Sequence, residues 1–245
     1  MTAFDVLTIH PDIVRACVHG SVLGRAVGRG LVDIGVHDIR EVTTDRHRTV
    51  DDTPYGGGAG MVLKVDVVAA ALARVRRPDS HVILTSPAGR TFSQADARRL
   101  ATLPHVVLVC GHYEGIDARI EALVDEELSL GDFVLTGGEI AASAIVDATA
   151  RLLPGVLGNA ASAGEESFDD DLLEYPQFTR PLAWEGREVP EVLRSGDHGR
   201  IRAWRLAQAQ ARTAARRPDL WARHCARHGL DPTVVPEVDE DPDSR

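Results

Sequence analysis

Short apolar runs alternate with longer stretches of helical periodicity along the first 155 or so residues. Phe4–His10, His81–Ser86 and Val106–Cys110 are rich in β-branched residues, as is typical of strands buried within a sheet. Helical spacing of apolar residues occurs over Val65–Val75, Ser93–Leu103 and Glu139–Leu152. This alternation predicts an α/β domain with a mostly parallel sheet.

Three positions mark the ends of the predicted helices. Pro11 follows the first strand and suits the first turn of a helix, where its missing N–H costs nothing. Ser93 is a good N-cap, because its side chain can accept a hydrogen bond from a free backbone amide. Pro154, followed by Gly155, should end the helix predicted over Glu139–Leu152.

The pattern changes after residue 158. Gly158 to Pro181 is rich in Gly, Ala, Ser and acids and has no clean period, so we expect a disordered linker or a functional lid. Helical patterns return over Pro190–Arg194, Gly199–Ala215 and Asp219–His228. We therefore expect an α/β domain over 1–158, a lid or linker over 159–178, a helical domain over 179–235 and a disordered acidic tail over 236–245.

Composition narrows the class of protein. The chain has 245 residues, of which 44% are hydrophobic and 26% charged, which indicates a globular protein. No apolar run approaches the roughly 18 residues of a membrane span, and the N-terminus does not look like a signal peptide. We expect a cytoplasmic protein. The three cysteines are widely spaced, which argues against a disulfide framework or a structural zinc site.

Charge is unevenly distributed. The net charge is −10, yet residues 194–228 contain nine arginines and two acids. Such local positive charge suits a nucleic-acid partner, although a basic segment can also be a plain soluble helix face. His224, Cys225 and His228 lie in this segment without a further ligand cluster. We expect them to form a solvated basic face and predict no metal site.

Two glycine-rich strings carry the candidate chemistry: residues 110–117 (CGHYEGID) and 129–139 (SLGDFVLTGGE). Each follows an apolar run, where a buried strand should leave its sheet, and ligands of open α/β sheets bind at such strand ends. Glycine there lets the backbone approach a ligand. The strings predict a small-molecule pocket made mostly of backbone, or, alternatively, two turns that use glycine for positive φ.

These strings resemble the bacterial tRNA (guanine-N1)-methyltransferases that act at position 37, S-adenosylmethionine enzymes of the SPOUT class. The resemblance continues, in order, through residues 54–61 (PYGGGAGM), 153–158 (LPGVLG), 179–181 (TRP), 192–198 (VLRSGDH) and 216–218 (RRP). It implies a SPOUT-type α/β domain with a deep C-terminal trefoil knot, a small helical domain, a homodimer and the tRNA anticodon loop as substrate. The knot would involve Ser86–Gly89, Gly111–Gly115 and Leu130–Gly138.

The resemblance also implies roles for particular residues. The S-adenosylmethionine site would comprise Ser86, Pro87, Gly111, Tyr113, Glu114, Leu130, Gly131, Asp132, Phe133, Val134, Leu135, Gly137 and Gly138. The tRNA contacts would include Asp51, Tyr55, Gly57, Arg180, His198 and Arg202. The family commonly has Arg where His112 stands and Tyr where Phe133 stands, which should alter peripheral contacts rather than the shape of the pocket.

Methylation of guanine N1 requires a base to remove its proton and a donor for the charge that develops on O6. Arg151 aligns with the family's essential arginine, although by position alone it could be a helix C-terminal cation. Glu166 stands where the family has its catalytic aspartate, and Asp169 or Asp170 could reach in instead. The sulfonium already activates the methyl group, so its transfer needs no metal, and a Mg²⁺ effect remains open.

Three other functions compete with this interpretation. The chain could be another SPOUT RNA methyltransferase acting on a ribose or a different base, although the acidic lid after Arg151 favours a base nitrogen. It could be an RNA-binding module without catalysis, which failure to bind S-adenosylmethionine would favour. A Rossmann dehydrogenase ranks last, because the glycine fingerprint and the ribose-binding acid are missing.

Overall fold

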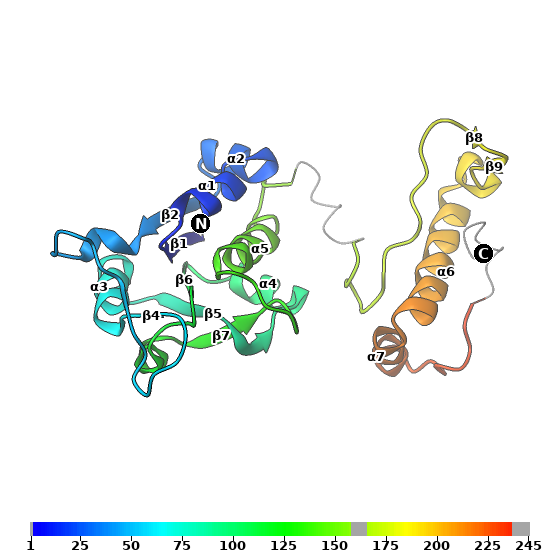
Figure 1. Ribbon diagram of the computed structural model, residues 1–245. Helices are drawn as coiled ribbons and strands as arrows, with labels where there is room; N and C mark the ends of the chain where they lie inside the picture. Colours follow the sequence, from blue (N-terminus) through cyan, green and yellow to red (C-terminus); the bar gives the residue numbers. More distant parts are fainter. Residues whose placement is uncertain (1, 158–165, 237–245) are drawn as a thin grey trace. The chain divides into compact units, whose positions relative to one another are not determined.

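The computed structural model in Figure 1 describes residues 2–157 and 166–236. The chain divides into two compact units, residues 1–160 and 161–245. The first contains β1 (Ala3–Thr8), α1 (Pro11–Val18), α2 (Ser21–Gly28), β2 (Asp33–Asp38), η1 (Ile39–Val42), β3 (Asp51–Asp52), β4 (Val62–Leu63), α3 (Val65–Val75), β5 (Ser80–Thr91), α4 (Gln94–Leu100), β6 (His105–Cys110), η2 (Ala118–Leu123), β7 (Glu126–Ser129) and α5 (Glu139–Ala150). The second contains β8 (Ala183–Trp184), β9 (Arg187–Glu188), η4 (Glu191–Arg194), α6 (His198–Arg216) and α7 (Pro218–His228).

The main sheet of the first unit has five strands in the order β2-β1-β6-β5-β7, and every neighbouring pair is parallel. The predicted mixed fold with a mostly parallel sheet is therefore confirmed. The central strand β6 is buried throughout, as expected from its unbroken apolar sequence. Strand β5 extends well beyond its predicted end, with a shift of register between Thr85 and Arg90 where it pairs with β7.

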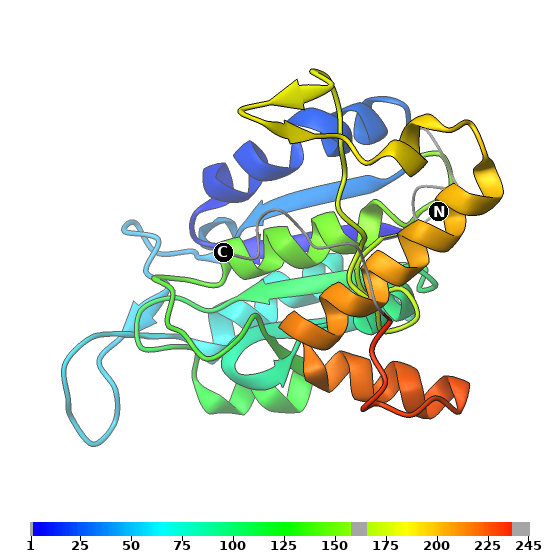
Figure 2. The ribbon, with the colours of Figure 1, turned by 90° about the vertical axis from the view of Figure 1, so that its right-hand side faces the viewer.

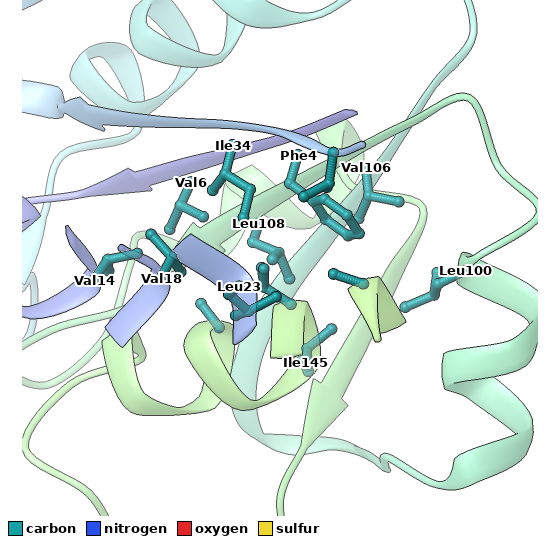
Figure 3. Close-up of a cluster of buried hydrophobic side chains, with 14 of the residues drawn as sticks. Phe4, Val6, Val14, Val18, Leu23, Ile34, Leu100, Val106, Leu108 and Ile145 are labelled. Carbon is teal, nitrogen blue, oxygen red and sulfur yellow. The ribbon is translucent and has the colours of Figure 1, made fainter. Parts of the chain in front are cut away.

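Apolar side chains cover both faces of this sheet. Along β6, Val106 and Leu108 point into one cluster with residues of α1, α2, α4 and α5 (Figure 3), while Val107 and Val109 point into the other with residues of α3. Alternate strand residues face opposite sides, so one continuous apolar run supplies both cores. Because both faces of the sheet are packed, the carboxyl ends of β1, β5, β6 and β7 are held in fixed positions.

Helix starts were predicted well and weak strands were not. Pro11 is the first residue of α1, Ser93 caps α4 in a reciprocal capping box with Asp96, and α3 has the predicted bounds. Helix α4 is shorter than expected, however. Strands β2 and β7 were not predicted, because Asp-Ile-Gly-Val-His-Asp and Glu-Glu-Leu-Ser are edge strands with few apolar residues.

In the second unit, a short β8–β9 hairpin precedes the long helix α6, which is followed by α7 (Figure 2). Leu172, Ala209, Trp221 and Cys225 form its apolar cluster. Residues 159–165 of the expected lid and 237–245 of the expected tail lie outside the described residues. Among the helices that are described, none has the length and apolar character to cross a membrane.

The expected solvated face on α7 is wrong for two of its three residues. His224 is only 4% exposed and Cys225 only 1%. The ring of His224 stacks on Trp221 with centroids 5.5 Å apart, so packing within the helical unit buries it. His228, one turn further on, is exposed.

Candidate active site

A cavity of about 480 Å³ lies at the carboxyl ends of β5, β6 and β7. The loops that follow these strands form its walls, as expected for a ligand site in a parallel sheet. Twelve of the thirteen predicted cofactor residues line it: Ser86, Pro87, Gly111, Tyr113, Glu114, Leu130, Gly131, Phe133, Val134, Leu135, Gly137 and Gly138. Asp132 is not among the lining residues, so the structure brings together all but one of the set.

Backbone hydrogen bonds tie the cavity loops to one another. The amide of Gly138 donates to the carbonyl of Gly111 over 2.7 Å, and His112 and Gly137 form an isolated antiparallel bridge. On the other side, Glu114 donates its amide to the carbonyl of Met61 over 3.0 Å. The first two contacts join the two glycine strings into a single wall, although about twenty residues separate them. The third joins the first string to the loop that contains Met61.

Gly138 is required by packing. A Cβ added there would lie 2.1 Å from Thr85 Oγ1 and 3.0 Å from the Cα of Cys110. A larger residue would therefore force β5, β6 and the start of α5 apart. Gly131 has a different reason, because its φ of +148° lies in the region that L side chains rarely adopt. The alternative interpretation of the strings, glycine used for positive φ, therefore applies at Gly131, whereas close packing accounts for Gly138.

Glu139 is a buried acid beside the cavity. The sequence alone predicts no role for this residue. It is 3% exposed, and its Oε1 accepts a hydrogen bond from Thr8 Oγ1 over 2.7 Å. Its Oε2 lies 3.9 Å from Nδ1 of His112, which lines the cavity. An acid in the first turn of a helix is a usable sequence signal, because the helix dipole stabilises it.

Burial raises the pKa of the Cys110 thiol well above its ordinary value, and the charge of Glu139 raises it further. Cys110 is the last residue of β6 and is buried in the apolar cluster that contains Val106 and Leu108. A neutral, inaccessible thiol is a poor nucleophile, so Cys110 supports the cavity by packing rather than by covalent chemistry.

The predicted catalytic residues lie in different units. Arg151 is the C-cap of α5 in the first unit, and its amide donates to the carbonyl of Asp147 over 3.2 Å. Glu166 belongs to the second unit, where its carbonyl accepts from the amide of Asp169 over 3.1 Å. Asp170 directs its carboxylate to Arg227 and His228, which argues against it as the base.

The predicted tRNA contacts also divide between the units. In the first, Asp51 begins β3, Tyr55 is fully exposed and Gly57 has a φ of 78° in the loop between β3 and β4. In the second, the side chains are exposed, one before β8 and two on α6: Arg180, His198 and Arg202. All of these residues except the half-buried Asp51 are exposed, as contact with a large ligand requires.

Comparison with known proteins identifies the family of the chain that forms this cavity. The family described as tRNA (Guanine-1)-methyltransferase TrmD matches residues 2–223. The chain belongs to this family. The resemblance carried by the glycine strings is thereby confirmed.

Three relatives, each named tRNA (guanine-N(1)-)-methyltransferase, are similar over most of the chain. The protein of Chloroflexus aurantiacus is 56% identical over 227 residues, which cover 91% of this chain and 89% of the relative. That of Chloroflexus aggregans is 55% identical over the same shares. That of Syntrophotalea carbinolica is 54% identical over 224 residues, 91% of each chain.

Proposed function

We propose that the chain transfers the methyl group of S-adenosylmethionine to N1 of guanine 37 in tRNA. The observation that carries this proposal is the glycine-walled cavity at the strand ends of a chain that matches the methyltransferase family over residues 2–223. Acting on tRNA would place the enzyme in the cytoplasm.

The cavity suits S-adenosylmethionine in size and lining. Its volume of about 480 Å³ lies within the range of small-molecule sites, roughly 300–1,000 Å³. Gly111, Leu130 and Gly137 line it, and their backbone groups would read the edge of an adenine. Glu114 is among the lining residues, and its negative charge would favour a cationic ligand. When bound, S-adenosylmethionine supplies a methyl group that its sulfonium already activates.

Glu166 and Arg151 would make the guanine nucleophilic. The Glu166 carboxylate would take the N1 proton, and the lone pair left on N1 would form the new bond to the methyl carbon as the carbon–sulfur bond breaks. Negative charge develops on O6 as the proton leaves, and the Arg151 guanidinium would donate hydrogen bonds to it. A positioned base typically contributes about 10²–10⁴-fold to such a rate.

Among the described residues, no cluster of three or more metal-ligating side chains lies at the cavity to hold Mg²⁺. Within residues 2–157 and 166–236, the one cluster of three or more His, Cys, Asp or Glu side chains that could hold a metal is Asp170, His224 and His228. None of these three lines the cavity. A hard oxygen-preferring ion would find a poor ligand set in two imidazoles.

We further propose that the enzyme acts as a homodimer whose cavity loops form the trefoil knot of the SPOUT class. The cavity lining includes apolar side chains that remain open to solvent: Phe133 is 55% exposed, Val134 87% and Leu135 39%. Ile140, on the following helix α5, is 48% exposed. A second copy covering this patch would complete the site. Sedimentation velocity at micromolar concentration tests the homodimer. An enzyme that is active and sediments as a stable monomer would contradict the proposal.

The decisive experiment is methylation of an unmodified tRNA transcript with guanines at positions 36 and 37. We expect N1-methylguanine at position 37 alone, and no product from a matched transcript with adenine there. Methyl at a ribose or at another base would support a different SPOUT activity. Calorimetric titration with S-adenosylmethionine separates these outcomes from a non-catalytic RNA-binding module, which would bind tRNA without the cofactor.

A further inference from the structure

Helix α7 places two histidines on the same side of the second unit. His224 and His228 are four residues apart, which puts their side chains next to each other on a helix. Their ring centroids are 4.5 Å apart. His224 is buried, whereas 45% of the His228 side chain is exposed, so the pair has one solvent-facing side. Two imidazoles at this spacing can bind one metal ion together.

A carboxylate from a distant part of the chain completes the group. Asp170 Oδ2 lies 2.6 Å from His228 Nε2 and 3.3 Å from His224 Nδ1. One ligand atom of each of the three residues lies within 4.8 Å of the other two. Oδ1 of Asp170 accepts a hydrogen bond from Arg227 over 3.0 Å, which fixes the carboxylate and leaves Oδ2 directed at the histidines.

The backbone that carries Asp170 is held in an unusual conformation. Phe168, Asp170 and Asp171 have φ values of 72°, 49° and 58°, in the left-handed region that few non-glycine residues adopt. Such backbone persists where the surroundings fix it, and it is common at ligand sites. Here Arg227 contacts both Asp170 and Asp171, the latter over 2.6 Å. The segment is therefore fixed with its carboxylate toward α7.

We propose that Asp170, His224 and His228 form a binding site for a divalent transition metal, of which zinc is the best match. Two imidazole nitrogens and one carboxylate oxygen are ligands that zinc prefers, with water completing four-coordination. Zinc binds such ligands at about 2.0–2.2 Å, which puts tetrahedral ligand atoms about 3.3 Å apart. The two distances to Asp170 Oδ2, 2.6 and 3.3 Å, lie near this value, and the three ligand atoms, all within 4.8 Å of one another, would draw together around the ion.

The bound metal would clamp residues 166–172 onto α7. In its absence, the link depends on hydrogen bonds and ion pairs. Asp170 contacts His224, Arg227 and His228, and Asp171 contacts Arg223 and Arg227. Metal–ligand bonds are stronger and connect positions 54 and 58 residues apart in sequence. Binding of zinc to the folded state alone should therefore stabilise the helical unit. None of the three ligands lines the cavity, but the clamped segment begins at Glu166, the proposed base.

The test is zinc titration of the full chain, prepared without a histidine tag and freed of metal by a chelator. We expect one zinc per chain and a higher melting temperature with zinc. His228→Gln and Asp170→Asn should each weaken binding by about tenfold or more and remove the thermal shift. Asn tolerates the left-handed backbone at position 170, so this variant should fold. His19→Gln, at the exposed end of α1, is the matched control and should bind zinc as the wild type does.

A second measurement keeps the proposal testable if a variant fails to fold. X-ray absorption spectra of the zinc-loaded wild type should show two imidazole ligands and oxygen, and cobalt(II) in the same site should give tetrahedral visible bands. Wild-type protein that does not bind one equivalent of zinc, or a spectrum without imidazole, would overturn the assignment. So would unchanged zinc affinity in both folded variants.

Discussion

The hydroxyl of Thr8 donates a hydrogen bond to Glu139 Oε1 over 2.7 Å and joins the end of β1 to the start of α5. Both residues are buried, and 131 positions separate them in sequence. The bond anchors the helix that follows the second glycine string against the central strands. It also fixes the carboxylate whose other oxygen faces His112 in the cavity wall.

Thr8→Val should destabilise the protein by about 1–3 kcal/mol, because a buried carboxylate oxygen loses its donor. Thr8→Ser keeps the hydroxyl and is the matched control, with a smaller loss. Urea denaturation followed by circular dichroism measures both. Equal stability of Thr8→Val and the wild type would show that the carboxylate finds another partner.

Gly138→Ala should distort the cavity. The new Cβ would lie 2.1 Å from Thr85 Oγ1 and 3.0 Å from backbone atoms of Cys110 and Gly111, an overpacking that typically costs about 1–3 kcal/mol. S-adenosylmethionine binding, measured by calorimetry, should weaken in parallel. Gly28→Ala on α2 meets no atom within 4 Å and serves as the control. Wild-type affinity in Gly138→Ala would refute the packing argument.

Acid should weaken the contact between β5 and α4. Two hydrogen bonds from Arg90, of 2.7 and 2.8 Å, hold the pKa of Asp96 well below its ordinary range, although desolvation opposes them. A lowered pKa in the folded state gives stability that is present above about pH 4, the unfolded value, and is lost as the pH falls further.

Asp96→Asn removes this titration and should cost about 1–3 kcal/mol at pH 7, since it breaks a charged pair and a helix cap. The difference in unfolding free energy between wild type and variant should shrink as the pH falls from 5 to 2. Denaturation of both proteins at several pH values measures this difference in unfolding free energy. A difference that stays constant with pH would exclude Asp96 as the titrating group.

Glu166→Gln should lower the methyl-transfer rate by about 10²–10⁴-fold, because the amide cannot accept the N1 proton. Cofactor affinity should not change. Asp169→Asn, on the neighbouring turn, is the comparison and should retain activity. Single-turnover rates with the tRNA transcript separate the two, and the reverse result would assign Asp169 as the base.

Arg202→Gln should weaken tRNA binding and reduce the slope of log affinity against log salt by about 0.7–0.9, the value of one phosphate contact. Arg202 is exposed on α6, where the first turn contains no acid. Arg25→Gln on α2 is an exposed helical arginine in the other unit and controls for net charge. An unchanged slope would remove Arg202 from the tRNA surface.

Local pattern was enough to predict much of the framework and the candidate site. The apolar runs gave the central strands β1, β5 and β6, and the 3.6-residue period gave α3 with its observed bounds. The glycine strings placed the cavity at the strand ends, and the family resemblance supplied the thirteen proposed cofactor residues, of which twelve line it. Each of these signals lies within a short window, where the sequence alone controls backbone preference and burial.

Tertiary structure decided the features that depend on residues far apart in the chain. The sequence contains Thr8, Glu139, Asp170 and His228, but no periodicity indicates that Thr8 bonds Glu139 or that Asp170 meets His228. Burial of His224 likewise depends on the packing of Trp221 in the helical unit. A local window can specify a strand or a helix. Only the folded chain determines which side chains lie within hydrogen-bonding distance, because that distance depends on how distant segments pack.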